Sequence, residues 1–189
     1  MKDYHFHYDP RYHNQYDYYI NNVITDGIMV IHKNQMRLND FVRGLEEFRG
    51  KINIGIELSS NSNYNKMERD IKELEEKNYK IILSLHTYKD SLHYLEVLKS
   101  IYPLLTRVHH LGHPFHKETI PLSDFVIEDF ISFCLAQNVL VELNERYLRK
   151  HLVNFYKEVK ERLNFLYSTD AHIPNKIGVY NKMKQYFLL

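Results

Sequence analysis

One alternating stretch decides the fold class: Lys51-Ile52-Asn53-Ile54-Gly55-Ile56-Glu57-Leu58. Successive side chains of a β-strand point to opposite faces, so the isoleucines share one apolar face and Glu57 ends the other, mixed face. Such a strand is expected in a barrel wrapped by helices, where the apolar face packs against the helices and the mixed face lines the interior. We therefore expect Glu57 at the C-terminal mouth of a barrel.

Similar stretches recur along the chain, and segments with helical spacing of apolar residues lie between them. The predicted strands are Tyr4 to Tyr8, Ile28 to His32, Lys51 to Leu58, Lys80 to His86, Arg107 to Gly112, Val139 to Asn144 and Leu163 to Ser168. The predicted helices include Leu38 to Phe48, Tyr64 to Asn78 and Leu122 to Gln137, the last with a candidate cap at Ser123. This alternation predicts an α/β fold of repeated βα units, with a parallel sheet or barrel.

The composition predicts one ordinary globular domain over residues 1–189, because 44% of the residues are hydrophobic, 26% are charged and no linker divides the chain. Lys plus Arg number 25 and Asp plus Glu number 24, so the net charge of +1 predicts no binding to nucleic acid or to a membrane surface. No signal stretch and no apolar span near ~18 residues is present. Cys134, the single cysteine, cannot form an internal disulfide, and we expect a reducing, cytoplasmic location.

Histidines and acidic residues stand at the ends of the predicted strands. In chain order these residues are His5 and His7, His32, Glu57, His86, His113, Glu142 with Asn144, and Asp170 with His172. The carboxyl ends of parallel strands meet at one mouth of a barrel, so these side chains are expected to converge. Imidazole and carboxylate groups suit zinc, manganese or iron, which need several donors at about 2.0 to 2.2 Å. The pattern therefore predicts a site for more than one metal ion.

Each residue also has a plainer interpretation when it is taken alone. His5 and His7 could be exposed on a terminal strand, and Glu57 could begin the following loop or helix. Asp170 could cap a helix that starts near Pro174. The remaining histidines are interpreted as structural or solvent-exposed: His93, His109, His110, His116 and His151.

A set of motifs in one order resembles the PHP family, named for polymerase and histidinol phosphatase. The motifs are His5-Phe6-His7, His13, Gly55-Ile56-Glu57, His86, Gly112-His113-Pro114 and Ser168-Thr169-Asp170-Ala171-His172. The resemblance runs from the first predicted strand to the segment after the last. It implies a distorted seven-stranded (βα)7 barrel with up to three metal ions at its mouth. The activity it most commonly implies is hydrolysis of phosphate monoesters.

The resemblance also assigns ligands by position. They are His5, His7, Glu57 and Asp170 for one ion, Glu57, His86 and His113 for a second ion, and His13 and His172 for a third ion. The family's Asp-His pair after the second strand is missing here, and His32 is the nearest substitute. The third site is therefore left open, as altered, partly occupied or absent. Glu142-Leu143-Asn144 approximates a family motif, and we expect it to support the ligands instead of binding metal.

The implied function is a metal-dependent phosphoesterase that acts on a small phosphorylated substrate. Two or three divalent ions of zinc, manganese or iron would activate a hydroxide. Asp170, His113 and His172 are the predicted catalytic residues, and either histidine could give a proton to the leaving group. One alternative is a metal-dependent amidohydrolase or nuclease, because such barrels also begin with His-x-His and finish with Asp. Another is a noncatalytic metal-binding module. Arg11, Lys33 and Arg146 lie near strand ends but are read as solvated charges.

Overall fold

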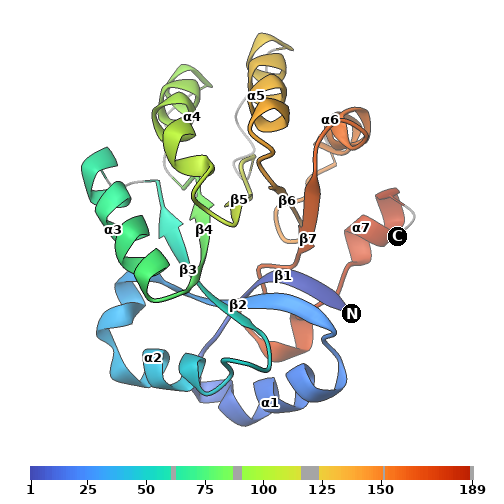
Figure 1. Cartoon of the computed structure of the whole chain (residues 1–189). Coiled ribbons are helices and arrows are strands. Elements are labelled where there is room, and N and C mark those ends of the chain that lie inside the picture. Colours follow the sequence, from blue (N-terminus) through green and yellow to red (C-terminus); the bar gives the residue numbers. More distant parts are fainter. Residues whose placement is uncertain (61–62, 87–90, 116–123, 151, 188–189) are drawn as a thin grey trace.

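A computed structural model describes residues 1–60, 63–86, 91–115, 124–150 and 152–187 (Figure 1). Strands and α-helices alternate throughout this part of the chain. The strands are β1 (Lys2–His7), β2 (Asp26–His32), β3 (Asn53–Ser59), β4 (Lys80–Ser84), β5 (His110–Gly112), β6 (Val141–Asn144) and β7 (Phe165–Ser168). The helices are α1 (His13–Asn22), α2 (Asn39–Glu46), α3 (Tyr64–Glu76), α4 (Ser91–Leu105), α5 (Asp124–Ala136), α6 (Leu152–Val159) and α7 (Asn181–Phe187). Three short 3₁₀ helices are Pro10–Tyr12, Lys33–Arg37 and Pro174–Lys176.

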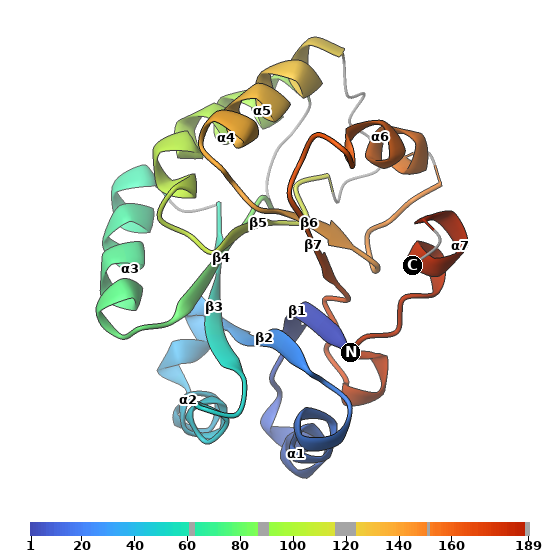
Figure 2. The same ribbon diagram turned by 45° about the vertical axis from the view of Figure 1, so that its right-hand side comes forward.

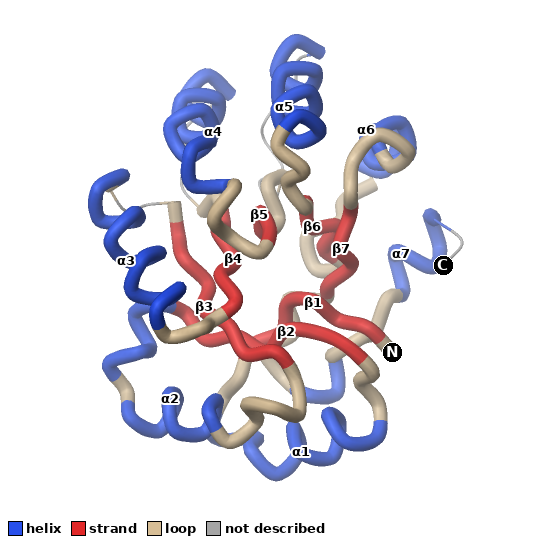
Figure 3. Tube along the Cα trace, viewed as in Figure 1, coloured by secondary structure: helices blue, strands red, loops and turns tan. Residues whose placement is uncertain are grey.

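The strands form one seven-stranded parallel sheet in the order β1-β2-β3-β4-β5-β6-β7. Figure 2 shows the strands curling around a central axis, and Figure 3 shows the helices outside the strands. Because the sheet is parallel and curls almost into a closed ring, every C-terminal strand end faces the same mouth. The fold is a (βα)7 barrel, which confirms the seven-stranded α/β architecture that the sequence predicts.

The barrel closes between β1 and β7 by few main-chain contacts. Phe6 pairs with Ala171 in an isolated bridge, and the Asp170 N–H donates to the His5 carbonyl at 2.8 Å. Further along the seam, the Tyr180 hydroxyl lies 2.6 Å from the Lys2 carbonyl oxygen. The seam is therefore held at the mouth by the segment that follows β7, which also carries predicted ligands.

Two separate apolar clusters confirm the expected division of strand faces. The larger cluster lies between the sheet and the helices, and it contains Ile56 of β3 and Leu83 of β4. The smaller cluster comprises Ile28, Val30 and Ile82. Ile82 therefore faces the opposite way from Leu83, as the two-residue period of a strand requires. The mixed faces line the barrel interior and lead to the mouth.

Several element boundaries differ from the prediction. The fifth strand begins at His110 instead of Arg107, because the Arg107 N–H still bonds to Leu104 at the end of α4. The fourth strand ends at Ser84, so His86 lies in the loop beyond it. Helix α3 begins at Tyr64 as predicted, with the Asn63 side chain accepting the Lys66 N–H. The expected cap at Ser123 lies outside the described residues. Helix α5 is described from Asp124 onward. No helix in the described ranges has both the length and the apolarity to cross a bilayer.

Asp3 ties β1 to the segment after β7. Its side chain is fully buried, and its two oxygens accept hydrogen bonds from the Thr169 N–H at 3.1 Å, the Thr169 hydroxyl at 2.5 Å and the Gly178 N–H at 2.9 Å. Buried donors of this kind are costly when they lose their acceptor. Asp3 therefore holds the strand end that precedes Asp170 in place.

We expect Asp3→Ala to destabilise the metal-free protein, because Thr169 and Gly178 then keep buried N–H groups without an acceptor. Each such group costs about 1–3 kcal/mol, so the free energy of unfolding should fall by about 2–4 kcal/mol in urea denaturation with chelator present. Asp17→Ala is the matched control, because Asp17 is half exposed and pairs with Lys51; its effect should stay below about 1 kcal/mol. Equal effects of the two substitutions would contradict this role of Asp3.

Candidate metal centre

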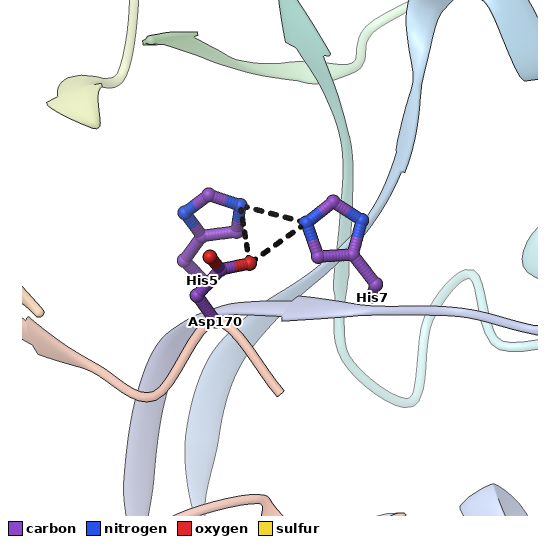
Figure 4. A group of neighbouring side chains, drawn as sticks. All are labelled: His5, His7 and Asp170. Atoms are coloured by element: carbon purple, nitrogen blue, oxygen red, sulfur yellow. Dashed lines mark hydrogen bonds and ion pairs between the residues drawn. The ribbon is translucent and has the colours of Figure 1, made fainter. Parts of the chain in front are cut away.

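Three ligand-type side chains meet where β1 and the segment after β7 come together (Figure 4). His5 and His7 are two residues apart on β1 and so share its interior face. Their Nε2 atoms lie 3.2 Å apart. Asp170 Oδ1 lies 3.1 Å from the Nε2 atom of His7 and 3.9 Å from that of His5. The sequence places these residues at opposite ends of the chain, and the barrel seam brings them together.

Glu57, at the end of β3, completes this group. Its Oε2 atom lies 3.5 Å from His7 Nε2 and 3.9 Å from His5 Nε2. Bonds of about 2.0–2.2 Å to one tetrahedral ion imply donor separations of about 3.3–3.6 Å. The distances measured here, 3.1 to 3.9 Å, bracket that range. His5, His7 and Asp170 therefore form one group at ligand spacing, and Glu57 lies at ligand spacing from both histidines.

The other oxygen of Glu57 faces a second pair of histidines. Glu57 Oε1 lies 3.3 Å from His86 Nε2 and 3.2 Å from His113 Nε2. His113 follows β5 in a left-handed backbone conformation, with φ of 25°, and its side chain is buried. Because Glu57 gives one oxygen to each group, it is positioned to bridge two ions.

His32 and His172 border the first group on its solvent side. His32 Nδ1 lies 2.7 Å from Glu57 Oε2, and His172 Nε2 lies 3.4 Å from Asp170 Oδ1. Both rings pack against His7, with ring centroids 4.4 Å and 4.2 Å away, respectively. The structure thus brings His32, the substitute for the missing family pair, directly to the cluster.

The structure does not bring His13, predicted as a ligand of a third ion, to the cluster. His13 is the first residue of α1, and its ring turns toward α2. Its Nε2 atom lies 3.3 Å from Glu47 Oε2, and its Nδ1 atom lies 3.1 Å from the Tyr8 hydroxyl. His13 belongs to none of the four ligand groups found among the described residues.

Glu142, on β6, supports the cluster from below. Its Oε1 atom accepts hydrogen bonds from His5 Nδ1 at 3.0 Å and from Asn144 Nδ2 at 2.9 Å, and also from the Ser168 hydroxyl. Its Oε2 atom accepts the His113 N–H. A carboxylate on the far nitrogen of a ligand histidine fixes which nitrogen faces the metal. Glu142 therefore leaves His5 Nε2 facing the cluster.

Sequence reasoning missed His110, which was interpreted as structural or exposed. His110 is 1% exposed, and it groups with His5 and Glu142 beneath the cluster. The missed signal is strand parity, because His110 pairs with the interior residue Ile82 in the sheet register. Parity thus places His110 inside the barrel, although it does not reveal the contact with Glu142.

The electrostatics of the site favour bound cations. Burial alone would raise the pKa of Glu57, but hydrogen bonding from neighbouring histidines, led by His113, holds that pKa well below its ordinary value. The same balance, with His172 and His7, holds the pKa of Asp170 well below its ordinary value. Burial lowers the pKa of His7 to about 4. At neutral pH these carboxylates are anionic and His7 is neutral, which are the forms that bind metal. Burial alone would lower the pKa of His5, but the Glu142 carboxylate raises it to about 10, so His5 would have to release a proton when an ion binds.

Comparison with solved structures finds the same fold in enzymes of low sequence identity. An adenine deaminase from Arthrobacter aurescens gives a TM-score of 0.57 at 8% identity, over 93% of this chain and 67% of that one. An amidohydrolase from Burkholderia ambifaria with bound Zn gives 0.54 at 8% identity, over 94% and 62%. A 4-hydroxy-tetrahydrodipicolinate synthase from Methylacidiphilum fumariolicum gives 0.56 at 14% identity, over 88% and 60%. At these identities the likeness shows the fold alone.

The sequence comparisons give no match. No family model matches the chain, and no curated protein matches it. The chain also spans only 50% to 67% of the length of its structural neighbours. The resemblance to the PHP family therefore remains a prediction that rests on the order of the motifs.

We expect Glu142→Gln to weaken metal binding, because a neutral amide polarises and orients His5 less strongly than a carboxylate does. Loss of such a partner costs about 10- to 100-fold in metal affinity, measured by competition with a chromophoric chelator. Glu128→Gln is the matched control on the surface, where Glu128 pairs with Arg162. Unchanged affinity in Glu142→Gln would show that Glu142 does not act through His5.

Proposed function

We propose that this protein is a metal-dependent hydrolase whose active centre is the His/Asp/Glu cluster at the mouth of the barrel. The observation that carries the proposal is the shared carboxylate Glu57, which faces two groups of donors at ligand spacing. The Oε2 atom of Glu57 is buried and accepts no hydrogen bond of normal geometry from the described residues, although the His32 imidazole lies 2.7 Å from it. A buried carboxylate oxygen in that position needs a positive partner, and a divalent ion supplies one.

The residues present fit divalent transition-metal ions. His5, His7, Glu57 and Asp170 would hold one ion, and Glu57, His86 and His113 would hold another, with His32 and His172 beside them. Imidazole and carboxylate donors suit zinc, manganese and iron. Ions bound in this way supply Lewis-acid chemistry, because they acidify water and polarise a phosphoryl or carbonyl oxygen at neutral pH.

Other side chains at the mouth can position a substrate. Arg146 Nη1 lies 3.4 Å from Asp170 Oδ2, and 49% of the Arg146 side chain is exposed. Its guanidinium is therefore fixed at the edge of the cluster and can still bind an oxyanion from solvent. His172 is 47% exposed beside the same carboxylate. An imidazole at that place is suited to give a proton to a leaving alcohol at neutral pH.

The substrate we propose is a small phosphate monoester. The order of ligands along the chain supports it through the resemblance to the PHP family, and Arg146 supports it through its fit to an oxyanion. An amidohydrolase is the second candidate, because two of the structural neighbours carry that type of name, an amidohydrolase and an adenine deaminase. The same ligands could polarise a carbonyl, so only a test of both substrate classes distinguishes the two candidates.

We expect the protein loaded with manganese, zinc or iron to hydrolyse phosphate monoesters and to lose this activity in chelator. The measurement is a panel of phosphate monoesters, amides and oligonucleotides, combined with metal analysis of the same samples. Turnover of amides alone would favour the amidohydrolase. Less than one metal ion per chain together with no turnover would contradict the proposal, and bound metal with no turnover would favour a noncatalytic module.

The proposal treats Asp170 as a ligand and His13 as lying outside the centre. We expect Asp170→Asn to lower kcat about 100-fold or more and to reduce bound metal, because an amide is a weaker donor than a carboxylate. His13→Gln should stay within about two-fold of the natural protein, because His13 contacts Glu47 outside the cluster. Circular dichroism melts of both variants control for folding. Comparable loss of activity in both would place His13 in the centre after all.

A further inference from the structure

Two cavities lie beside the candidate metal centre. The first, of about 580 Å³, lies between the loop after β6 and the segment after β7, and its wall includes Asp170 and His172. The second, of about 690 Å³, includes His32, Glu57 and His86 in its wall. Both cavities therefore open directly onto the ligand cluster, and a substrate can extend into either of them.

The basic residues of the second cavity are largely neutralised by the protein itself. Lys33 Nζ lies 2.7 Å from a Glu73 carboxylate oxygen, and Lys77 Nζ lies 2.6 Å from the other. Lys66 Nζ lies 2.6 Å from Asp70. Three of the four basic residues that line this cavity are thus paired with carboxylates in its own wall. The three lysines of this cavity are therefore engaged with carboxylates, and Arg37 is its remaining lysine or arginine.

The first cavity is different, because Arg146 pairs with Asp170 of the same wall but the two lysines of this wall form no ion pair within the described residues. Lys182 Nζ donates to two main-chain carbonyls, of Glu145 at 3.0 Å and of Arg146 at 3.1 Å. The Glu145 carboxylate instead accepts the main-chain N–H of Lys182 at 2.7 Å. Lys176 is exposed and forms no ion pair within the described part of the chain. Positive charge therefore remains available in the wall of this cavity.

The wall of the first cavity also has apolar side chains. It contains Ala171, Ile173 and Val179, and 38% of Ile173 is exposed. The lining of the first cavity thus combines three kinds of group: residues of the ligand cluster, apolar side chains and lysines. A ligand that matches all three has a phosphoryl group, an apolar body and a second negative charge.

We propose that the first cavity binds the leaving group of the substrate, and that it selects a leaving group with an apolar body that ends in an anionic group such as a carboxylate. This inference rests on the proposed hydrolase function and deepens it by naming the substrate class. Arg146 lies where the phosphoryl group meets the cavity, and Lys176 with Lys182 faces the far end of the leaving group.

The first test measures binding without turnover. The probes are 4-hydroxybenzoate, the alcohol released from a carboxylated aryl phosphate, and phenol, which lacks the carboxylate. Titration calorimetry or NMR should show 4-hydroxybenzoate binding about five-fold or more tightly than phenol. Lys176→Gln should reduce this preference about three- to five-fold, because it removes one exposed ion pair. Lys66→Gln, in the second cavity, should leave the preference unchanged.

The second test compares hydrolysis of 4-carboxyphenyl phosphate with that of phenyl phosphate. Lys176→Gln should lower the ratio of the two kcat/KM values about three- to five-fold. Equal binding of the two probes, or equal loss of preference in Lys176→Gln and Lys66→Gln, would overturn the inference even when both esters are hydrolysed. Selective binding that depends on Lys176, with neither ester hydrolysed, would support the cavity as an anion site and overturn the phosphoesterase function instead.

Discussion

The structure depends on the burial of one carboxylate, that of Glu57, inside the barrel. An anion in that position without partners would cost several kcal/mol. Its partners are imidazoles that arrive from other strand ends: His32 from β2, His86 from beyond β4 and His113 from beyond β5. The pairing of His32 with Glu57 in the β2–β3 ladder shows that sheet register sets this arrangement. A slip of one residue would turn each side chain to the helix-covered face.

Much of the fold can be predicted because the strands alternate so regularly. Buried isoleucine and leucine on one face, with polar groups ending the other, leave few architectures open. The strand ends are harder to predict, because tertiary contacts decide them. Arg107 could continue a strand by composition, yet its N–H completes the last turn of α4. Its guanidinium pairs with Glu75 on α3, outside the barrel. Neither contact leaves a signal in the local sequence.

The residues of the candidate site also fall into some that the sequence predicts and some that it does not. Ligand-type residues on the strands, such as His5, His7 and Glu57, converge as strand parity predicts. His13 does not, because a residue beyond a strand end can turn toward the mouth or toward the next helix, and spacing along the chain does not distinguish the two. His110 was interpreted too simply, since its partner Glu142 comes from another strand. Pairings between distant strands are set by three-dimensional register, which a single sequence does not show.

The seam between β1 and β7 is held by few main-chain contacts, so ligands on both of its sides bear on the closure of the barrel. His5 and His7 belong to the first strand, and Asp170 follows the last one, so an ion held by all three clasps the two edges of the sheet together. Binding of such an ion would then be coupled to closure of the seam. Whatever loosens the clasp lowers the affinity for the ion, and whatever removes the ion frees the edges. An ion bound at this centre would therefore stabilise the closed barrel in addition to its proposed role in catalysis.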